Sequence, residues 1–292
     1  KNWEAILDRL IRLREIDGLR FKFIIQVDTL CHKSPGFIEK AARAGCNRVF
    51  IGLENIDPEA LLGAKKRQNK IWEYREMLQA WKDAGVVTYA GYILGFPEDT
   101  PEKIRRNIEI MKRELPLDLV EFFFLTPLPG SEDHQKMARN GVWTDPDLNK
   151  YDLNHRVSHH PHMSDQAWEQ IYLDAWKQYY TLEHIETVLR RGVARGLNTK
   201  QLFLTLGAFY GSVTIEKLHP LEAGFFRHKV RLQRRPGLPI ENPLIFYPRR
   251  AWEITTTHLK WLVLYLRLRR LHARILKDPA AKSYSDQALI HG

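Results

Sequence analysis

The first half of the chain alternates continuous apolar runs with segments of helical periodicity, and this alternation constrains the fold most. The apolar runs cover residues 21–27, 48–53, 86–94 and 119–125, with helical patterns such as 2–16 before and between them. Runs that are apolar throughout fit strands buried on both faces. Strands that alternate with helices return through crossovers to the same end of a sheet. The pattern therefore predicts an α/β chain with a parallel sheet.

Two further features support βα units of about forty residues. The segment A-R-A-G-C-N-R-V-F-I-G (42–52) is echoed by K-D-A-G-V-V-T-Y-A-G (82–91). Capping residues with proline at the next position, which suit the first turn of a helix, predict helix starts at Ser34-Pro35, Asp57-Pro58-Glu59 and Thr100-Pro101-Glu102. Parallel strands gather ligands at their carboxyl ends, so a site is expected there.

The pattern changes after Gly130. A short helical piece at 135–139, an extra strand at 152–158 and an aromatic helix capped by Ser164 are expected, followed by helices, a proline-broken stretch at 236–248 and a last helix at 257–276. We predict three parts: a partial barrel (1–130), an extension with the aromatic helix (131–196), and a basic, mostly helical region (197–292).

Charge and cysteine content narrow the setting. The net charge of +10 is uneven, since residues 1–180 hold 26 Lys and Arg against 27 Asp and Glu, whereas 181–292 hold 19 against 8. The two cysteines make no disulfide framework, and no secretory leader is recognisable. A cytoplasmic location is expected, with peripheral contact to a membrane left open.

The strand ends carry the most informative motifs. Q-V-D (26–28), G-L-E-N (52–55), G-Y-I-L-G-F-P (91–97) and F-F-F-L-T-P-L-P-G-S (122–131) follow one another along the chain. In this order they resemble strands three to six of the radical S-adenosylmethionine (SAM) partial barrel, and the resemblance covers about residues 1–135. It implies a partial (βα) barrel, a SAM site, and a [4Fe–4S] cluster in the intact protein.

The resemblance implies cofactor-binding residues. Their chemistry suits SAM, which has a flat adenine base, a diol and a charged methionine tail. Glycines allow close backbone approach, and a carboxylate can accept hydrogen bonds from hydroxyls or an ammonium. Singly, the glycines could serve only turns or packing, and Glu54 a cap or a salt bridge. The candidates are Gln26, Asp28, Glu54, Asn55, Gly91, Ile93, Gly95, Pro97, Leu125, Thr126 and Pro127.

The chain departs from the resemblance in its cysteines. Radical SAM proteins hold their cluster with C-x-x-x-C-x-x-C, and Cys31 and Cys46, fifteen positions apart, cannot supply it. We expect the chain alone to be inactive, with the first two strands and their cysteines lying upstream or lost, and favour truncation. The strand at 21–27 is then expected to be an exposed edge beside a half-open cleft.

The segment after the barrel resembles that of cobalamin-binding radical SAM proteins. It contains Y-D-L (151–153), H-H-P-H-M-S (159–164), and an aromatic helix with Trp176 and Tyr179-Tyr180. The resemblance implies a cobalamin domain upstream, an electron donor, a small-molecule or lipid-like substrate, and methyl transfer or rearrangement at an unactivated carbon after reductive SAM cleavage. The aromatic helix is expected to pack on the barrel, with a substrate surface as the minority alternative.

Histidines 155, 159, 160 and 162 lie close enough in sequence to invite a metal interpretation, but no cysteine completes a tetrahedral set. We expect solvated or substrate-facing imidazoles and no metal.

In the basic region, H-L-K-W-L-V-L-Y-L-R-L-R-R-L-H-A-R (258–274) suits an anionic membrane surface, and equally a helix packed on the domain. Nucleic acid is a third partner, which we disfavour; it stays open because a basic patch alone does not distinguish the phosphates of RNA from those of lipids.

The leading hypothesis is the SAM-binding portion of a radical SAM enzyme of the cobalamin type. The competing hypothesis is a cluster-free, noncatalytic module that binds a nucleotide or a membrane. A phosphate-binding βα barrel of another kind is a third, supported only by G-F-P-E-D (95–99).

Overall fold

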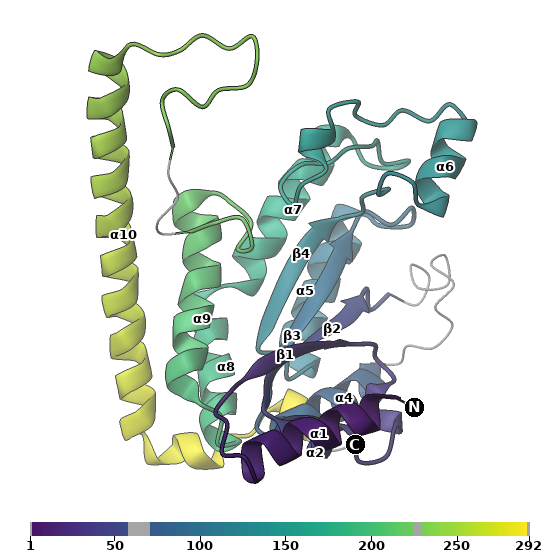
Figure 1. The fold of residues 1–292 in the computed structure, drawn as a ribbon, viewed down its shortest axis with the longest axis vertical. Coiled ribbons are helices and arrows are strands. Elements are labelled where there is room, and N and C mark those ends of the chain that lie inside the picture. Colours follow the sequence, from purple (N-terminus) through teal and green to yellow (C-terminus); the bar gives the residue numbers. More distant parts are fainter. Residues whose placement is uncertain (1, 58–70, 225–228, 291–292) are drawn as a thin grey trace.

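The structure, a computed structural model, describes residues 2–57, 71–224 and 229–290. Within them, four parallel strands form one sheet in the order β1 (Phe23–Val27), β2 (Cys46–Glu54), β3 (Val87–Leu94) and β4 (Leu119–Phe124) (Figure 1). Each strand begins and ends within two residues of its predicted bounds. The α/β class and the partial parallel barrel are confirmed.

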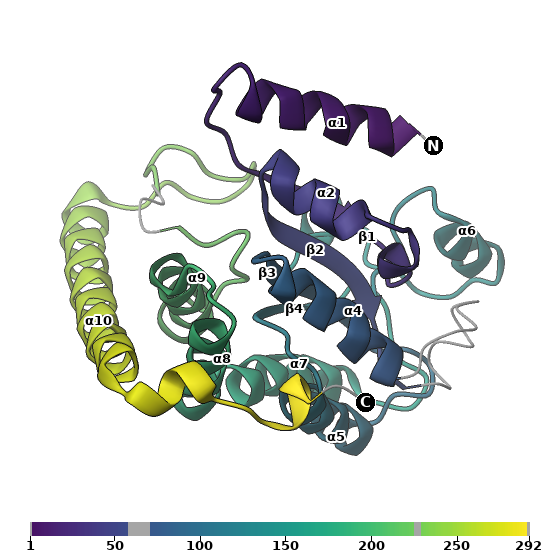
Figure 2. The same ribbon diagram turned by 90° about the horizontal axis from the view of Figure 1, so that it is seen from below.

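Helices that connect successive strands cover one face of the sheet. They are α2 (Phe37–Ala44), α4 (Ile71–Asp83) and α5 (Pro101–Glu114), while α1 (Asn2–Glu15) packs on α2 (Figure 2). Strand side chains that point toward these helices, such as Val49, Ile51 and Ala90, are fully buried. This apolar layer is the core that packs the sheet against its helices.

Two of the predicted helix starts are confirmed and one is wrong. The Thr100 and Ser164 hydroxyls each accept a hydrogen bond from the backbone N–H three residues on, at 3.2 Å. Ser34 does not cap α2. It closes the short helix η1 (Cys31–Lys33), because its N–H donates to the Cys31 carbonyl (3.1 Å), and α2 begins after Gly36, which has φ +71°. The start predicted at 57–59 reaches outside the described residues.

The aromatic helix α7 (Asp165–Tyr179) packs on β4, as predicted. The Trp176 indole meets Phe122 edge-on at 5.3 Å, and Tyr172 stacks on Phe124 at 4.2 Å between ring centroids. Tyr180 follows the helix, and its hydroxyl accepts from the Val120 N–H (3.0 Å) and donates to the Val120 carbonyl (2.7 Å). These bonds occupy backbone groups on the β4 edge that would otherwise be free to pair with another chain.

A buried ion pair joins α4 to the start of β4. Lys82 and Asp118 are both inaccessible to solvent and bond directly to each other, and the Asp118 carboxylate also accepts from the Thr88 N–H (2.9 Å) and hydroxyl (3.0 Å). Burial lowers the pKa of the Lys82 ammonium, while Asp118 opposes that shift. The pair lies at the end of the sheet opposite the candidate site, so its role is structural.

The region after residue 130 differs from prediction in two places. The strand expected at 152–158 is absent from the described structure apart from one bridge, Thr144 to Ser158. The Asp152 carboxylate accepts from the N–H groups of Asn154 (2.8 Å) and His155 (3.0 Å), and such a turn competes with extended pairing. The helix α6 (Glu132–Arg139) extends the helical piece that we predicted.

Beyond α7 the described chain is helical. The elements are α8 (Leu182–Ala194), α9 (Thr199–Gly211), η3 (Ser212–Glu216) and α10 (Pro243–Lys277), with short turns η2 (Leu148–Lys150), η4 (Pro279–Ser283) and η5 (Gln287–Leu289). The helix α10 starts fourteen residues earlier than predicted. Pro243 occupies its first turn, where a missing N–H is harmless, and the Asn242 side chain caps it. The division at 130 and 196 stays a prediction.

Two remaining features bear on the later argument. As expected, β1 is an edge strand, in which Ile24 is 48% exposed. The half-open cleft expected beside it stays a prediction. Among the described helices, none is both long and apolar enough to cross a membrane.

Candidate functional site

The face of the sheet opposite α2, α4 and α5 carries several of the predicted site residues, and we call it the inner face. In register across the strands, Gln26 pairs with Phe50 and Phe50 with Tyr89. One step toward the carboxyl ends, Gly52 pairs with Gly91 and Gly91 with Glu121. Residues paired in a ladder project to the same side of a sheet, so these two rows share the inner face.

Glu54 lies where β2 reaches the mouth of this face, in an unusual backbone conformation. Its φ of +62° is in the left-handed region, and the Asn55 N–H donates to the Leu53 carbonyl (2.8 Å), closing a three-residue turn about Glu54. A Cβ placed on Gly52 would lie 3.6 Å from Glu54 Oε1, so the carboxylate stands over Gly52. Such strain in a non-glycine residue is concentrated at functional sites.

Gly91 is surrounded more closely than the sequence suggests. A Cβ there would lie 2.9 Å from Phe50 Cζ and 3.3 Å from Phe123 Cε2. The absent side chain therefore lets two of the chain's own rings approach the backbone from either side. Gly52 and Gly91 are paired across the two strands, and we call them the Gly52–Gly91 stripe. Gly91 is buried beneath these rings whereas Gly52 is half-buried, and the role of Gly91 toward an adenine stays a prediction.

Gly95 has a packing reason for lacking a side chain. Its φ is +105°, and a Cβ would lie only 2.2 Å from Cζ2 of Trp168, whose indole N–H donates to the Leu94 carbonyl (3.2 Å). The Asp99 carboxylate accepts from the N–H groups of Gly95 (2.8 Å) and Phe96 (3.0 Å). The turn after β3 is thus shaped by α7 and by Asp99. This arrangement agrees with the alternative, given by the sequence, that Gly95 serves a turn and close packing.

The other predicted residues divide by location. Asn55 is fully buried, and its carbonyl oxygen accepts from the Asp57 N–H (2.8 Å) and the Tyr92 hydroxyl (2.9 Å), so its side chain braces the loop. Asp28 and Pro97 are exposed, and the Asp28 carboxylate accepts from the Leu30 N–H (2.9 Å). A cofactor-binding role for these three residues stays a prediction.

The end of β4 closes the mouth of the inner face. The Leu125 N–H donates to the Leu94 carbonyl (2.9 Å), which continues the β3–β4 ladder, and the Thr126 hydroxyl donates to the Phe124 carbonyl (3.1 Å). Leu125 and Thr126 are half-buried and Pro127 is buried. The structure thus brings Gln26, Glu54, Gly91 and Ile93 to one face and places Leu125 and Thr126 at its rim.

Sequence reasoning missed Glu121, which is paired in register with Gly91. It is fully buried, and neither carboxylate oxygen has a hydrogen-bond partner among the described residues. Burial raises its pKa to about 7, and burial together with the Glu121 carboxylate raises the pKa of Tyr89 well above its ordinary value. A lone carboxylate inside the apolar run L-V-E-F-F-F-L was the available signal, because unpaired buried charge is costly.

The two thiols do not fit an iron–sulfur cluster. Cys46 is 5% exposed and its Sγ donates to the Arg48 carbonyl (3.1 Å), as expected of a core thiol, and Cys31 is 8% exposed. Burial raises the pKa of each thiol to about 11. Cluster ligands are thiolates that converge on one centre, so these two residues hold no cluster.

Of the four histidines singled out in the sequence, three make side-chain hydrogen bonds or ion pairs within the protein. His155 pairs with Asp152 (2.8 Å) and His159 with Asp165 (2.9 Å). His160 is buried, its Nε2 lies 2.8 Å from the Phe96 carbonyl, and its Nδ1 accepts from the N–H groups of residues 162 and 163. Within the described ranges, no three His, Cys, Asp or Glu side chains are arranged to hold a metal ion.

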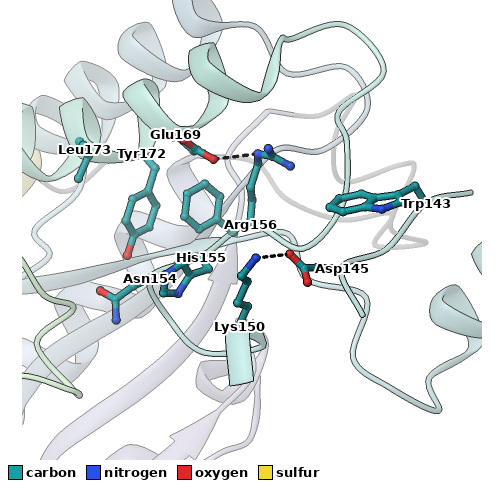
Figure 3. Close-up of a pocket in the computed structure, with 10 residues that line it drawn as sticks. Trp143, Asp145, Lys150, Asn154, His155, Arg156, Glu169, Tyr172 and Leu173 are labelled. Carbon is teal, nitrogen blue, oxygen red and sulfur yellow. Dashed lines mark hydrogen bonds and ion pairs between the residues drawn. The ribbon is translucent and has the colours of Figure 1, made fainter. Parts of the chain in front are cut away.

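A cavity of about 320 Å³ opens beyond the end of β4, between α7 and the segment that precedes it (Figure 3). Its polar walls are two ion pairs, Lys150 with Asp145 (2.7 Å) and Arg156 with Glu169 (3.0 Å). Aromatic and other residues complete the lining: Phe124, Trp143, Asn154, His155, Tyr172 and Leu173. Phe124, the last residue of β4, lines this cavity, so the cavity lies near the rim of the inner face.

Together, these features describe a parallel α/β fold with two paired glycines on its inner face and, at the mouth of that face, a glutamate in the left-handed backbone region. No protein-family model matches the chain. In sequence it is 25% identical over 189 residues to a bacteriochlorophyllide d C-8(2)-methyltransferase of Chlorobaculum tepidum, across 63% of this chain and 40% of that protein. It is 24% identical over 136 residues to a hopanoid C-2 methylase of Rhodopseudomonas palustris, across 47% of this chain and 26% of that protein.

Similar solved structures include TsrM, a radical SAM methyltransferase of Kitasatospora setae with cobalamin and a [4Fe–4S] cluster bound. The TsrM structure and this chain are 21% identical in sequence and superpose with a TM-score of 0.46, over 60% of this chain and 40% of the TsrM chain. OxsB, a cobalamin-dependent radical SAM enzyme, covers 98% of this chain and 47% of its own with 10% identity and a TM-score of 0.42. At these TM-scores the structural likeness adds no argument of its own.

The sequence relatives of this chain are named as methyltransferases and a methylase, and the solved structures similar to it are named as radical SAM enzymes. The resemblance carried by the strand ends is thereby confirmed. The chain spans at most 44% of the length of these curated relatives.

Proposed function

We propose that this chain is the SAM-binding portion of a cobalamin-type radical SAM methyltransferase that acts on a small molecule. The observation that carries the proposal is the convergence of Glu54, the Gly52–Gly91 stripe and Ile93 on one face at the mouth of a parallel sheet. The curated sequence relatives of the chain include a methyltransferase and a methylase. Because the chain spans only part of their length, methyl transfer is proposed for the whole protein.

In this proposal the adenine and ribose of SAM lie at the Gly52 end of the stripe, which is half-buried and not covered by the two rings, with Ile93 as an apolar contact. Glu54 accepts hydrogen bonds from the ribose hydroxyls or the ammonium, since its carboxylate stands over Gly52 in a fixed conformation. Gln26 lies on the same face at the open edge of the sheet. These residues bind and orient the nucleotide, and the aromatic rings beside them exclude water.

The cluster and cobalamin are assigned to the whole protein and not to residues of this chain. The two buried thiols do not fit a cluster. In the whole protein, an electron donor would serve the cluster. A cluster-free module that binds a nucleotide remains the competing function, because two buried cysteines that hold no cluster are equally compatible with such a module.

Titration calorimetry of the purified chain with SAM tests the binding step. We expect saturable binding that Glu54→Gln weakens about 10- to 100-fold, since hydrogen bonds to a charged group contribute about 1.5–3 kcal/mol. Glu98→Gln, an exposed carboxylate just past the motif, is the matched control and should bind normally. Absence of binding, or equal loss in both variants, would contradict the proposal.

A competition experiment separates the two functions. A SAM site discriminates for the methionine portion, so adenosine and ATP should displace SAM poorly. Displacement by ATP at comparable concentration would favour the nucleotide-binding module instead.

A further inference from the structure

The helix α10 has one face anchored firmly on α9. A Cβ on Gly207 would lie 2.9 Å from Leu268, and one on Gly211 would lie 2.3 Å from the Trp261 ring, so the helices are in close contact. The Trp261 indole donates to Glu216 (3.0 Å), and His272 bonds with the Thr199 hydroxyl (2.9 Å). The buried residues of α10 therefore fix which of its sides faces outward.

The outward side of α10 is apolar over several turns. Helical spacing places its members opposite the buried Leu264 and Leu268. The exposed side chains are Trp252 (71%), Leu259 (56%), Leu262 (53%), Val263 (65%) and Leu266 (38%). We call these five residues the outer stripe. Figures 1 and 2 show α10 at the border of the molecule, with no other element beyond it in the described structure.

Basic residues flank and continue the outer stripe. Residues 243–277 contain eight Lys and Arg but a single Glu. Arg269 and Arg270 follow the stripe at its carboxyl end, and neither makes an ion pair in the part of the chain that the structure describes. An apolar stripe bordered by cations, with an exposed Trp, has the composition of a helix that lies in the interface of an anionic membrane.

We propose that α10 docks through the outer stripe on an anionic lipid surface, with the helix axis parallel to the membrane plane. The stripe enters the boundary between headgroups and acyl chains, while Arg269 and Arg270 contact lipid phosphates. A second copy of the chain is disfavoured, because two such faces would repel by charge. Nucleic acid is disfavoured, because phosphate contacts would leave the apolar stripe in water. The inference is independent of the proposed SAM site.

Vesicle co-sedimentation tests this surface. The chain should bind vesicles of mixed phosphatidylcholine and phosphatidylglycerol, bind pure phosphatidylcholine far more weakly, and dissociate as salt is raised. Arg269→Gln with Arg270→Gln should weaken binding about 30-fold, since each cation near an anionic surface contributes about 1 kcal/mol. Leu262→Ser with Val263→Ser should weaken it at least about tenfold through lost apolar burial.

Matched controls lie on other elements. Ile6→Ser, on α1 and 58% exposed, and Arg106→Gln, exposed on α5, should bind vesicles like the unmodified chain, with circular dichroism confirming the fold of each variant. Failure to bind anionic vesicles would overturn the proposal. So would self-association abolished by the Leu262/Val263 variant, or binding of RNA that competes with vesicles and survives that variant.

Discussion

At the residue scale, two carboxylates of the inner face show how differently sequence reveals function. Glu54 was predictable because it ends a strand in the motif G-L-E-N, although its left-handed backbone was not. Glu121 sits in the middle of an apolar strand, where its neighbours hide it. Its place in an apolar run was a local signal, but its burial without a hydrogen-bond partner depends on tertiary packing over the inner face, which the sequence does not reveal.

Glu121 leads to a prediction about pH. Its folded pKa of about 7 lies above the ordinary 4.5, so the folded protein holds the proton more tightly than the unfolded chain does. The stability due to this group is present below pH 4.5 and is lost as pH rises through 7, by about 3 kcal/mol. Glu121→Gln should therefore gain stability relative to the unmodified chain over that interval in urea titrations. Parallel pH curves for the two proteins would refute this.

The buried pair of Lys82 and Asp118 supplies a second prediction. Asp118→Ala leaves an ammonium with neither solvent nor a counter-charge, and we expect a loss of about 3–5 kcal/mol in the free energy of unfolding. Asp83→Ala is the control, because its pair with Arg195 is 46% exposed on the Asp83 side; it should cost less than about 1 kcal/mol. Equal losses in the free energy of unfolding of the two variants would show that Asp118 does not stabilise the buried Lys82 ammonium.

At the scale of the elements, the inner face can be probed with two neighbouring glycines. Gly91→Ala forces a Cβ to within 2.9 Å of Phe50 and 3.3 Å of Phe123, whereas Gly52→Ala meets only Glu54 Oε1 at 3.6 Å. The first should cost about 1–3 kcal/mol through overpacking, and the second should be nearly neutral. Chemical denaturation measures both, and the reverse order would mean that the packing described here is incorrect.

The edge position of β1 predicts its exchange behaviour. Its N–H groups that point away from β2 have no strand beyond them in the described sheet, so amides of Phe23–Val27 should exchange faster than those of β3. Hydrogen exchange read by mass spectrometry distinguishes the two strands. Equal protection in a monomer would indicate that something covers β1.

Strand positions were accurate in the sequence interpretation because buried parallel strands are continuous apolar runs. The errors have local causes. Asp152 makes a side-chain turn where a strand was expected, Gly36 replaces Ser34 as the cap of α2, and Pro243 starts a helix where proline was taken as a break. In each case one short-range backbone preference was taken for another.

At the scale of the whole molecule, the sheet presents two faces with different tasks. One face is sealed by helices, and β4 is protected at its edge by Tyr180. The other face carries the candidate ligand residues and meets α9 through contacts such as Tyr89 with Phe209 at 5.7 Å. The helix α10 packs on α9 from outside, so the proposed membrane contact and the proposed nucleotide site lie on opposite sides of α9. One surface can then bind lipid while the mouth of the sheet stays accessible.

The central claim is that SAM binds at the carboxyl ends of β2, β3 and β4. Backbone amide shifts recorded by nuclear magnetic resonance during titration with SAM test it most directly. The account predicts saturable shifts concentrated at residues 52–55, 91–95 and 124–127. No saturable shifts, or shifts confined to other parts of the chain such as the cavity beside Trp143, would contradict it.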